Sequence, residues 1–182
     1  MGDGRWLPDH RTLIVRTYAE GSSQSRDIYY VVTGSDTTAH PVAVTSADET
    51  AAAPSPDGTL VAYNSDETGT QEVYVQPFPS GQGRLQVSHE GGGTPRWSHD
   101  GRSLYYLDKR NHLVVVTIQS RPALAATNVR DLGGDVVPVF GAGNATNSFD
   151  VAPDGRILVA EPVTGAFKLV LVRNWMAAGA VH

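Results

Sequence analysis

Four aspartates recur along the chain in the same short phrase, and they are the first candidates for chemistry. The phrase reads Trp6-Leu7-Pro8-Asp9, Pro54-Ser55-Pro56-Asp57, Trp97-Ser98-His99-Asp100 and Val151-Ala152-Pro153-Asp154. A carboxylate can act as a general base or as a metal ligand. Asp followed by Gly between two extended runs instead favours a tight turn, in which the carboxylate accepts hydrogen bonds from backbone N–H groups. We therefore predict structural turn residues, and no catalytic residue, at Asp9, Asp57, Gly58, Asp100, Gly101, Asp154 and Gly155.

Two histidines flank equivalent aspartates, since His10 follows Asp9 and His99 precedes Asp100. Two imidazoles and a carboxylate could bind a transition metal. Neither histidine belongs to a closely spaced His pair, and the two lie in separate repeats, so exposed turn histidines are the favoured interpretation. The loop at Asp66-Glu67 could hold calcium, but it lacks the spacing of an EF-hand. We predict no metal and no cofactor.

Other motifs of known chemistry are incomplete. The run Gly91-Gly92-Gly93-Thr94 is not followed by Gly-Lys-Ser/Thr, so it is not a phosphate-binding loop. The pair Gly141-x-Gly143 lacks the strand–turn–helix context of a dinucleotide fingerprint, and no Gly-x-Ser-x-Gly motif is present. The sequence therefore favours binding over catalysis.

The repeated pattern also predicts the β-strands that position these residues. After each aspartate comes one apolar run and, beyond a polar gap, a second, for example Leu60–Tyr63 and Val73–Val75. Repeats of roughly 40–50 residues made of short strands are typical of propeller blades. We predict an all-β propeller of about four four-stranded blades, with no significant helix. The blades are expected at residues 1–46, 47–90, 91–135 and 136–182 of a single domain.

The amino-acid composition limits the classes of partner that the chain is expected to bind. The 182 residues are 40% apolar and carry a net charge of −5, with no Cys. This charge argues against a broad basic face for nucleic acid. No apolar stretch reaches the roughly 18–20 residues of a membrane span, and the first residues lack the features of a signal peptide. We expect neither nucleic-acid binding nor membrane insertion.

The repeats resemble those of TolB-like propellers, which are related to WD40 repeats. The segment from Glu49 to Ile118 resembles the propeller at the C-terminal end of many bacterial serine/threonine protein kinases, with its Glu-Val-Tyr-Val-x-Pro-Phe-Pro, Gln-Val-Ser and Gly-Gly-x-x-Pro-x-Trp-Ser phrases. The segment from Phe149 to Arg156, followed by Leu169 to Trp175, resembles the terminal blade of those proteins. His10 departs from the pattern where Gly is expected, and His99 departs where Pro is expected. The resemblance allows either the cytoplasm or the extracytoplasmic part of a membrane-anchored protein. No kinase catalytic motif is present.

The expected function is a non-catalytic scaffold for protein–protein interaction or ligand sensing. The resemblance implies that it forms a C-terminal portion of a larger propeller protein such as a bacterial kinase. One alternative is a lyase or hydrolase with its site at the channel mouth, and another is a purely structural, self-assembling half-propeller.

Assembly is the last expectation. Four blades of a type found in larger propellers would leave two open apolar faces. We expect a homodimer that closes a ring of about eight blades, through residues near Trp6–Val15 and Leu169–Trp175. The alternative is a monomer whose N-terminal residues complete the last blade. Trp6, Trp97 and Trp175 are expected to be core or blade-interface residues.

Overall fold

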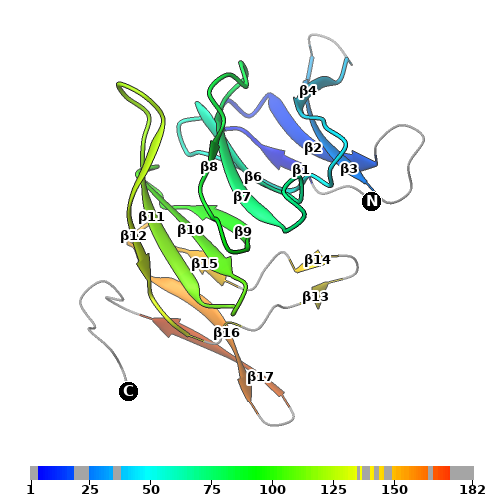
Figure 1. The fold of residues 1–182 in the computed structure, drawn as a ribbon. Helices are drawn as coiled ribbons and strands as arrows, with labels where there is room; N and C mark the ends of the chain where they lie inside the picture. The colour runs from blue at the N-terminus through cyan, green and yellow to red at the C-terminus, as the bar shows by residue number, and fades with distance from the viewer. Residues whose placement is uncertain are drawn as a thin grey trace.

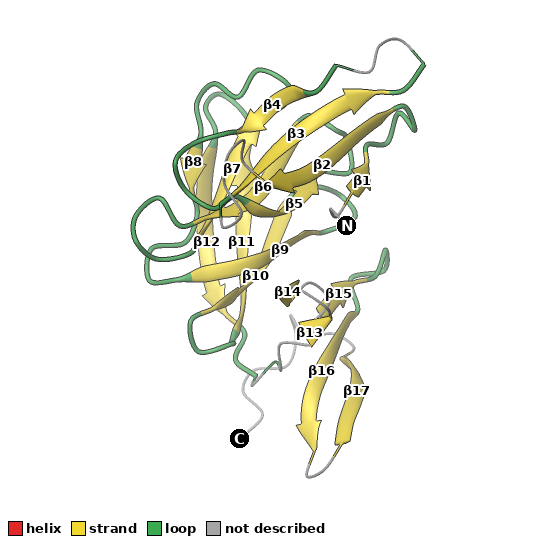
Figure 2. Cartoon of the chain, turned by 90° about the vertical axis from the view of Figure 1, so that its right-hand side faces the viewer, coloured by secondary structure: helices red, strands yellow, loops and turns green. Residues whose placement is uncertain are grey.

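Every regular element of the chain is a β-strand (Figure 2) in the computed structural model, which describes residues 4–18, 25–34, 38–134, 136, 140–141, 144–145, 149–163 and 166–172. These strands form three sheets of four strands, one of three and one of two. The described residues include no helix that could cross a membrane. The predicted all-β propeller architecture is confirmed, with three described strands in the last blade.

The large sheets succeed one another along the chain, and we number them as blades 1 to 4. Blade 1 contains β1 (Gly4–Trp6), β2 (Thr12–Tyr18), β3 (Arg26–Val32) and β4 (His40–Ala43). Blade 2 contains β5 (Thr50–Pro54), β6 (Leu60–Ser65), β7 (Glu72–Pro77) and β8 (Leu85–Gln86). Blade 3 contains β9 (Gly92–Trp97), β10 (Ser103–Asp108), β11 (Leu113–Gln119) and β12 (Ala125–Asp131). Blade 4 contains β15 (Phe149–Val151), β16 (Ile157–Val163) and β17 (Ala166–Val172).

Within each blade, consecutive strands are neighbours and antiparallel. Each aspartate turn joins the first strand to the second, as expected; in blade 3, Trp97 pairs with Leu104. All four aspartate turns therefore lie on one face of the propeller, which we call the turn face. The second-to-third strand loops and the crossovers between blades lie on the opposite face, which we call the loop face.

The blades stack along an open arc (Figure 1), with blade 1 at one end and blade 4 at the other. Strand β6 shows why the inner strands have continuous apolar sequences, since both of its faces are buried. Its Val61 and Tyr63 pack with blade 1, whereas Leu60 and Ala62 pack with blade 3. The apolar run at residues 113–118 is covered on both faces in the same way, since Leu113 packs towards blade 4 and Val114 towards blade 2.

The crossover from blade 3 to blade 4 contains strands of its own. It contains a two-stranded hairpin, β13 (Phe140–Gly141) with β14 (Asn144–Ala145). The apolar run at residues 168–172 forms the end of β17, and the burial of its side chains lies outside the described part of the structure.

Candidate binding site between blades 2 and 3

The four aspartate turns share one geometry. A carboxylate oxygen of each aspartate accepts the backbone N–H two residues further on, at 2.9 Å in Asp9, 3.0 Å in Asp57, 3.0 Å in Asp100 and 3.2 Å in Asp154. Asp57 also accepts the Ser55 hydroxyl at 2.6 Å and the Thr59 hydroxyl at 2.9 Å. Hydrogen bonds from the Thr12 hydroxyl and backbone lower the pKa of Asp9 to about 2. These carboxylates are therefore engaged by hydrogen bonds within their own turns.

The residue after each aspartate adopts a left-handed backbone conformation. The φ angles are 71° at Gly58, 70° at Gly101 and 79° at Gly155, while His10 takes the same conformation at 53°. Successive turns also nest. A Cβ atom at Gly58 would lie 3.4 Å from the Pro8 ring of the preceding blade, and one at Gly101 would lie 3.6 Å from the Pro56 ring. Blade 3 has His99 at the position of these prolines. In the next blade, a Cβ atom at Gly155 would meet nothing within 4 Å.

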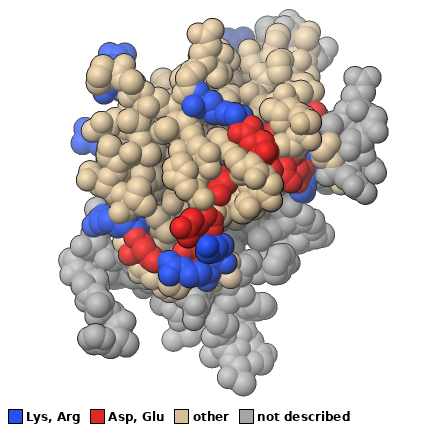
Figure 3. All heavy atoms as spheres, in the orientation of Figure 1, with Lys and Arg blue, Asp and Glu red and all other residues tan. Residues whose placement is uncertain are grey.

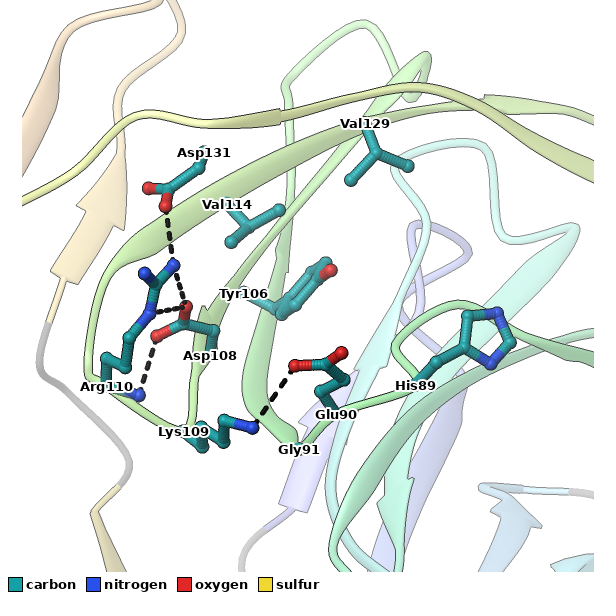
Figure 4. Close-up of a pocket in the computed structure, with 10 residues that line it drawn as sticks. All are labelled: His89, Glu90, Gly91, Tyr106, Asp108, Lys109, Arg110, Val114, Val129 and Asp131. Carbon is teal, nitrogen blue, oxygen red and sulfur yellow. Dashed lines mark hydrogen bonds and ion pairs between the residues drawn. The ribbon is translucent and has the colours of Figure 1, made fainter.

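The loop face carries a hollow of about 430 Å³ between the crossover from blade 2 and the outer strands of blade 3. Figure 4 shows its apolar wall, formed by Tyr106, Val114 and Val129, and its charged rim. Tyr106 and Val114 are held in place because they belong to the core between blades 2 and 3, whereas Val129 is 57% exposed. Ten residues line the hollow: His89, Glu90, Gly91, Tyr106, Asp108, Lys109, Arg110, Val114, Val129 and Asp131.

A cluster of Asp108, His112 and Asp131 borders the hollow, with potential ligand atoms within 4.8 Å of one another. Arg110 bridges the two carboxylates, with Nη2 2.9 Å from Asp108 and 2.7 Å from Asp131. The ring Nδ1 of His112 lies 3.1 Å from Asp131. The Arg110 guanidinium therefore already supplies a positive charge between the two carboxylates. Its charge neutralises theirs and so weakens their attraction for a metal ion.

Hydrogen bonding keeps both carboxylates of this cluster ionised. Burial acts to raise the pKa of Asp108, but bonds from the backbone of His112 and from Arg110 outweigh it and lower that pKa. Burial also acts to raise the pKa of Asp131, and contacts with His112, Gly133 and Arg110 lower it overall. The cluster is thus a satisfied ion-pair network, unlike a pair of carboxyl groups tuned to exchange protons.

Lys109 divides the loop-face surface into two hollows. Its Nζ lies 3.1 Å from Glu90, and both side chains are largely exposed. A Cβ atom at Gly91 would lie 3.0 Å from the Lys109 Cβ, so glycine lets the lysine stem cross at this point. A second hollow of about 260 Å³ lies beyond Lys109, and Thr70, Gln71 and Asn111 are among the residues that line it. An exposed ion pair of this kind contributes little stability and can be displaced.

Buried carboxyl groups lie deeper between the blades. Glu72 begins β7 and accepts hydrogen bonds from the Ser88 hydroxyl and, at 2.9 Å, from the Gly91 N–H, which fixes the crossover beside the hollow. Asp27 occupies the equivalent position in blade 1, and burial raises its pKa. Glu49 is fully buried, and burial raises its pKa although the Thr45 and Ser65 hydroxyls donate to it.

Several of these residues were missed by sequence reasoning. The sequence motifs drew attention to Asp66-Glu67 and Gly91–Thr94, which do lie on the loop face, and to His10 and His99, which lie in turn-face turns. Among the described residues, neither histidine belongs to a cluster close enough to share a metal. The repeated Asp27-Ile28-Tyr29 and Glu72-Val73-Tyr74 phrases could have identified the buried carboxyl groups.

Acidic and basic side chains alternate on the face shown in Figure 3 and do not separate into patches of one sign. A ligand held mainly by bulk charge, such as a nucleic acid, would need a continuous basic surface.

Comparison with known proteins agrees with the architecture. TolB from Acinetobacter baumannii aligns with 92% of this chain at 16% identity and a TM-score of 0.63. The chain has a TolB-like β-propeller fold. A puromycin-hydrolysing peptidase from Mycobacterium tuberculosis aligns with 96% of it at 15% identity and a TM-score of 0.66. A gluconolactonase from Xanthomonas campestris aligns with 87% of it at 15% identity and a TM-score of 0.58.

The chain spans 39%, 30% and 55% of the lengths of these three proteins, in the same order. No protein-family model and no curated protein sequence matches it. The TolB-like fold is shared by TolB and by enzymes of different kinds. The function must therefore be inferred from the residues of the site and not from the fold.

Proposed function

We propose that this TolB-like propeller is a non-catalytic binding module whose loop face recognises a short segment of a partner protein. The observation that carries the proposal is the hollow of about 430 Å³, with an apolar wall and a rim of both charge signs. Such a site fits one apolar side chain flanked by charged ones, as in a peptide. The context that the resemblance implies, a propeller carried by a bacterial serine/threonine kinase, belongs to this proposal and rests on the segment from Glu49 to Ile118.

The state of the titratable groups supports binding over turnover. A general base needs a free acceptor with a pKa near the working pH. Asp108 and Asp131 instead have lowered pKa values, and Arg110 contacts both. The cluster also lies at the end of the outermost strand, β12, whereas the enzyme alternative placed its site at the channel mouth.

A peptide-display selection on the immobilised chain tests the proposal. Enriched peptides should bind the wild type and lose at least tenfold in affinity for Val129→Arg, which fills the hollow. Val44→Arg is the matched control because Val44 is also exposed, at 44%, but lies outside the hollow. Peptides that bind both variants equally, or no enrichment at all, would reject the hollow as the site. Hydrolysis of lactone or peptide substrates that disappears in His112→Ala would instead favour an enzyme whose site is the cluster of Asp108, His112 and Asp131.

A further inference from the structure

Trp97 shows how one blade docks on the preceding one. It is 8% exposed, and its indole N–H donates to the Ala53 carbonyl oxygen in the first strand of blade 2 at 2.9 Å. Leu104, which pairs with Trp97, and Val116, which pairs with Leu104, are both fully buried in the same core. These three residues form a stripe across blade 3 that faces blade 2.

Blade 1 carries the same stripe. Trp6 stands three residues before Asp9, as Trp97 stands three residues before Asp100. Trp6 pairs with Leu13, and Leu13 pairs with Val31. Their neighbour Ile14 points the other way, into the core with blade 2. Trp6 is 53% exposed, because no described blade covers the stripe. The single chain therefore buries Trp6 neither in a core nor between two of its described blades.

Blade 4 carries the complementary face. Ile157 and Val159 pack into the core with blade 3, so Leu158 between them points outward and is 38% exposed. Leu158 pairs with Asp150 in the first strand of the blade. Asp150 stands four residues before the turn residue Asp154, and Ala53 stands four residues before Asp57, so the two positions are equivalent. In blade 2, the carbonyl oxygen of Ala53 accepts the Trp97 indole N–H. The outer side of blade 4 thus repeats the acceptor position that blade 2 offers to blade 3.

Charge at the innermost strands is also complementary. The position four residues before the turn aspartate is occupied by Arg5, Ala53, Arg96 and Asp150 in blades 1 to 4. Burial and Arg5 both act to lower the pKa of Arg96, whereas Asp150 acts to raise it. Arg96 therefore interacts electrostatically with both Arg5 and Asp150. If blade 1 of a second copy followed blade 4, Asp150 would lie between Arg96 and the second copy's Arg5. Opposite charges would then alternate at the new junction.

We propose that two copies of this chain pair head to tail, with blade 1 of each docked on blade 4 of the other, to close a ring of about eight blades. Each Trp6 indole donates to the Asp150 carbonyl oxygen of the other copy, as Trp97 does to Ala53. Trp6 on the outer face of blade 1 and Leu158 on the outer face of blade 4 are both exposed, so the described residues leave these two faces open for this contact. The proposal does not depend on the hollow, which lies between blades 2 and 3.

Light scattering of the full chain across micromolar concentrations tests the pairing. We expect twice the 19.4 kDa chain mass for the wild type. Trp6→Ser and Leu158→Asp should each give the monomer mass, and circular dichroism should show that both keep the wild-type strand content. Val44→Arg, at an exposed site on neither face, should remain dimeric.

Mixing the two monomeric variants distinguishes head-to-tail pairing from other dimers. A Trp6→Ser chain retains an intact blade 4, and a Leu158→Asp chain retains an intact blade 1, so an equimolar mixture should form a heterodimer through one intact contact. A monomeric wild type would overturn the proposal, in favour of closure by the chain's own N-terminal residues or of a blade from elsewhere. A dimer that survives Leu158→Asp would also overturn it, because blade 4 would not be part of the interface.

Discussion

Replacing His10 by glycine should stabilise the propeller. His10 is the only non-glycine residue at this position of the four aspartate turns, and its φ of 53° lies in the left-handed region. Its backbone N–H donates to Leu7 at 3.0 Å, as that of Gly101 donates to Ser98 at 3.0 Å, so the turn itself is unchanged. The side chain is exposed, and its removal opens no cavity.

The expected gain follows from two opposing contributions. A left-handed conformation costs a residue with a Cβ atom roughly 1–2 kcal/mol, and glycine avoids that cost. Glycine also gives the unfolded chain more freedom, which offsets about 0.4–1 kcal/mol of the gain. With the middle of each range, the net increase in the free energy of unfolding should be about 0.8 kcal/mol, or a Tm increase of roughly 2–3 °C for a domain of this size.

Urea unfolding followed by tryptophan fluorescence measures this change. The midpoint should rise in His10→Gly while the slope stays constant. His10→Ala is the control, because it removes the imidazole but keeps the backbone strain, and it should not gain stability. Gly155→Ala introduces the same strain where a Cβ atom meets nothing within 4 Å, and should lose about 1 kcal/mol. An unchanged His10→Gly, or an equal gain in His10→Ala, would refute the reasoning about φ.

Three further outcomes are expected. Asp57→Ala should lose roughly 1–2 kcal/mol in the same urea assay, because Asp57 accepts from Ser55 and Thr59; an unchanged midpoint would contradict a structural role for the turn carboxylate. Burial raises the pKa of Glu49, so its contribution to stability is complete at acid pH and is lost as pH rises through that pKa. Glu49→Gln should therefore gain Tm relative to the wild type between pH 4 and 8, and a difference that does not vary with pH would argue against a raised pKa. Arg110→Gln should release Asp108 and Asp131 and create Zn²⁺ affinity, detectable by calorimetry and lost when His112 is also changed to Ala.

The scaffold was predictable because its requirements repeat along the sequence. Each turn needs a carboxylate acceptor and a residue that tolerates positive φ, so Asp57-Gly58 and Asp100-Gly101 reveal their turns without knowledge of the remaining fold. Apolar runs such as residues 60–63 reveal inner strands, because neighbouring blades cover both of their faces. These are local signals, and the structure contains the strands that they predict.

The candidate site was not predictable in the same way. The hollow joins His89, Tyr106 and Val129, which come from a crossover and two different strands. Its character depends on Arg110, whose guanidinium reaches both Asp108 and Asp131. No spacing rule links an arginine in a hairpin to an aspartate at the end of the outer strand, since their approach is set by strand length and register.

The two faces of the propeller differ in what they require of the sequence, and this difference supports the loop face as the site of function. On the turn face, all four turns keep the aspartate, and three keep the glycine beside it. On the loop face, the loop after β6 reads Asp66-Glu67-Thr68-Gly69-Thr70-Gln71, whereas that after β10 reads only Lys109-Arg110-Asn111-His112. Loops on a rigid scaffold can vary without disturbing the core, and binding residues are most often found on them. The hollow lies on this face, where its lining can change while the aspartate turns continue to hold the blades.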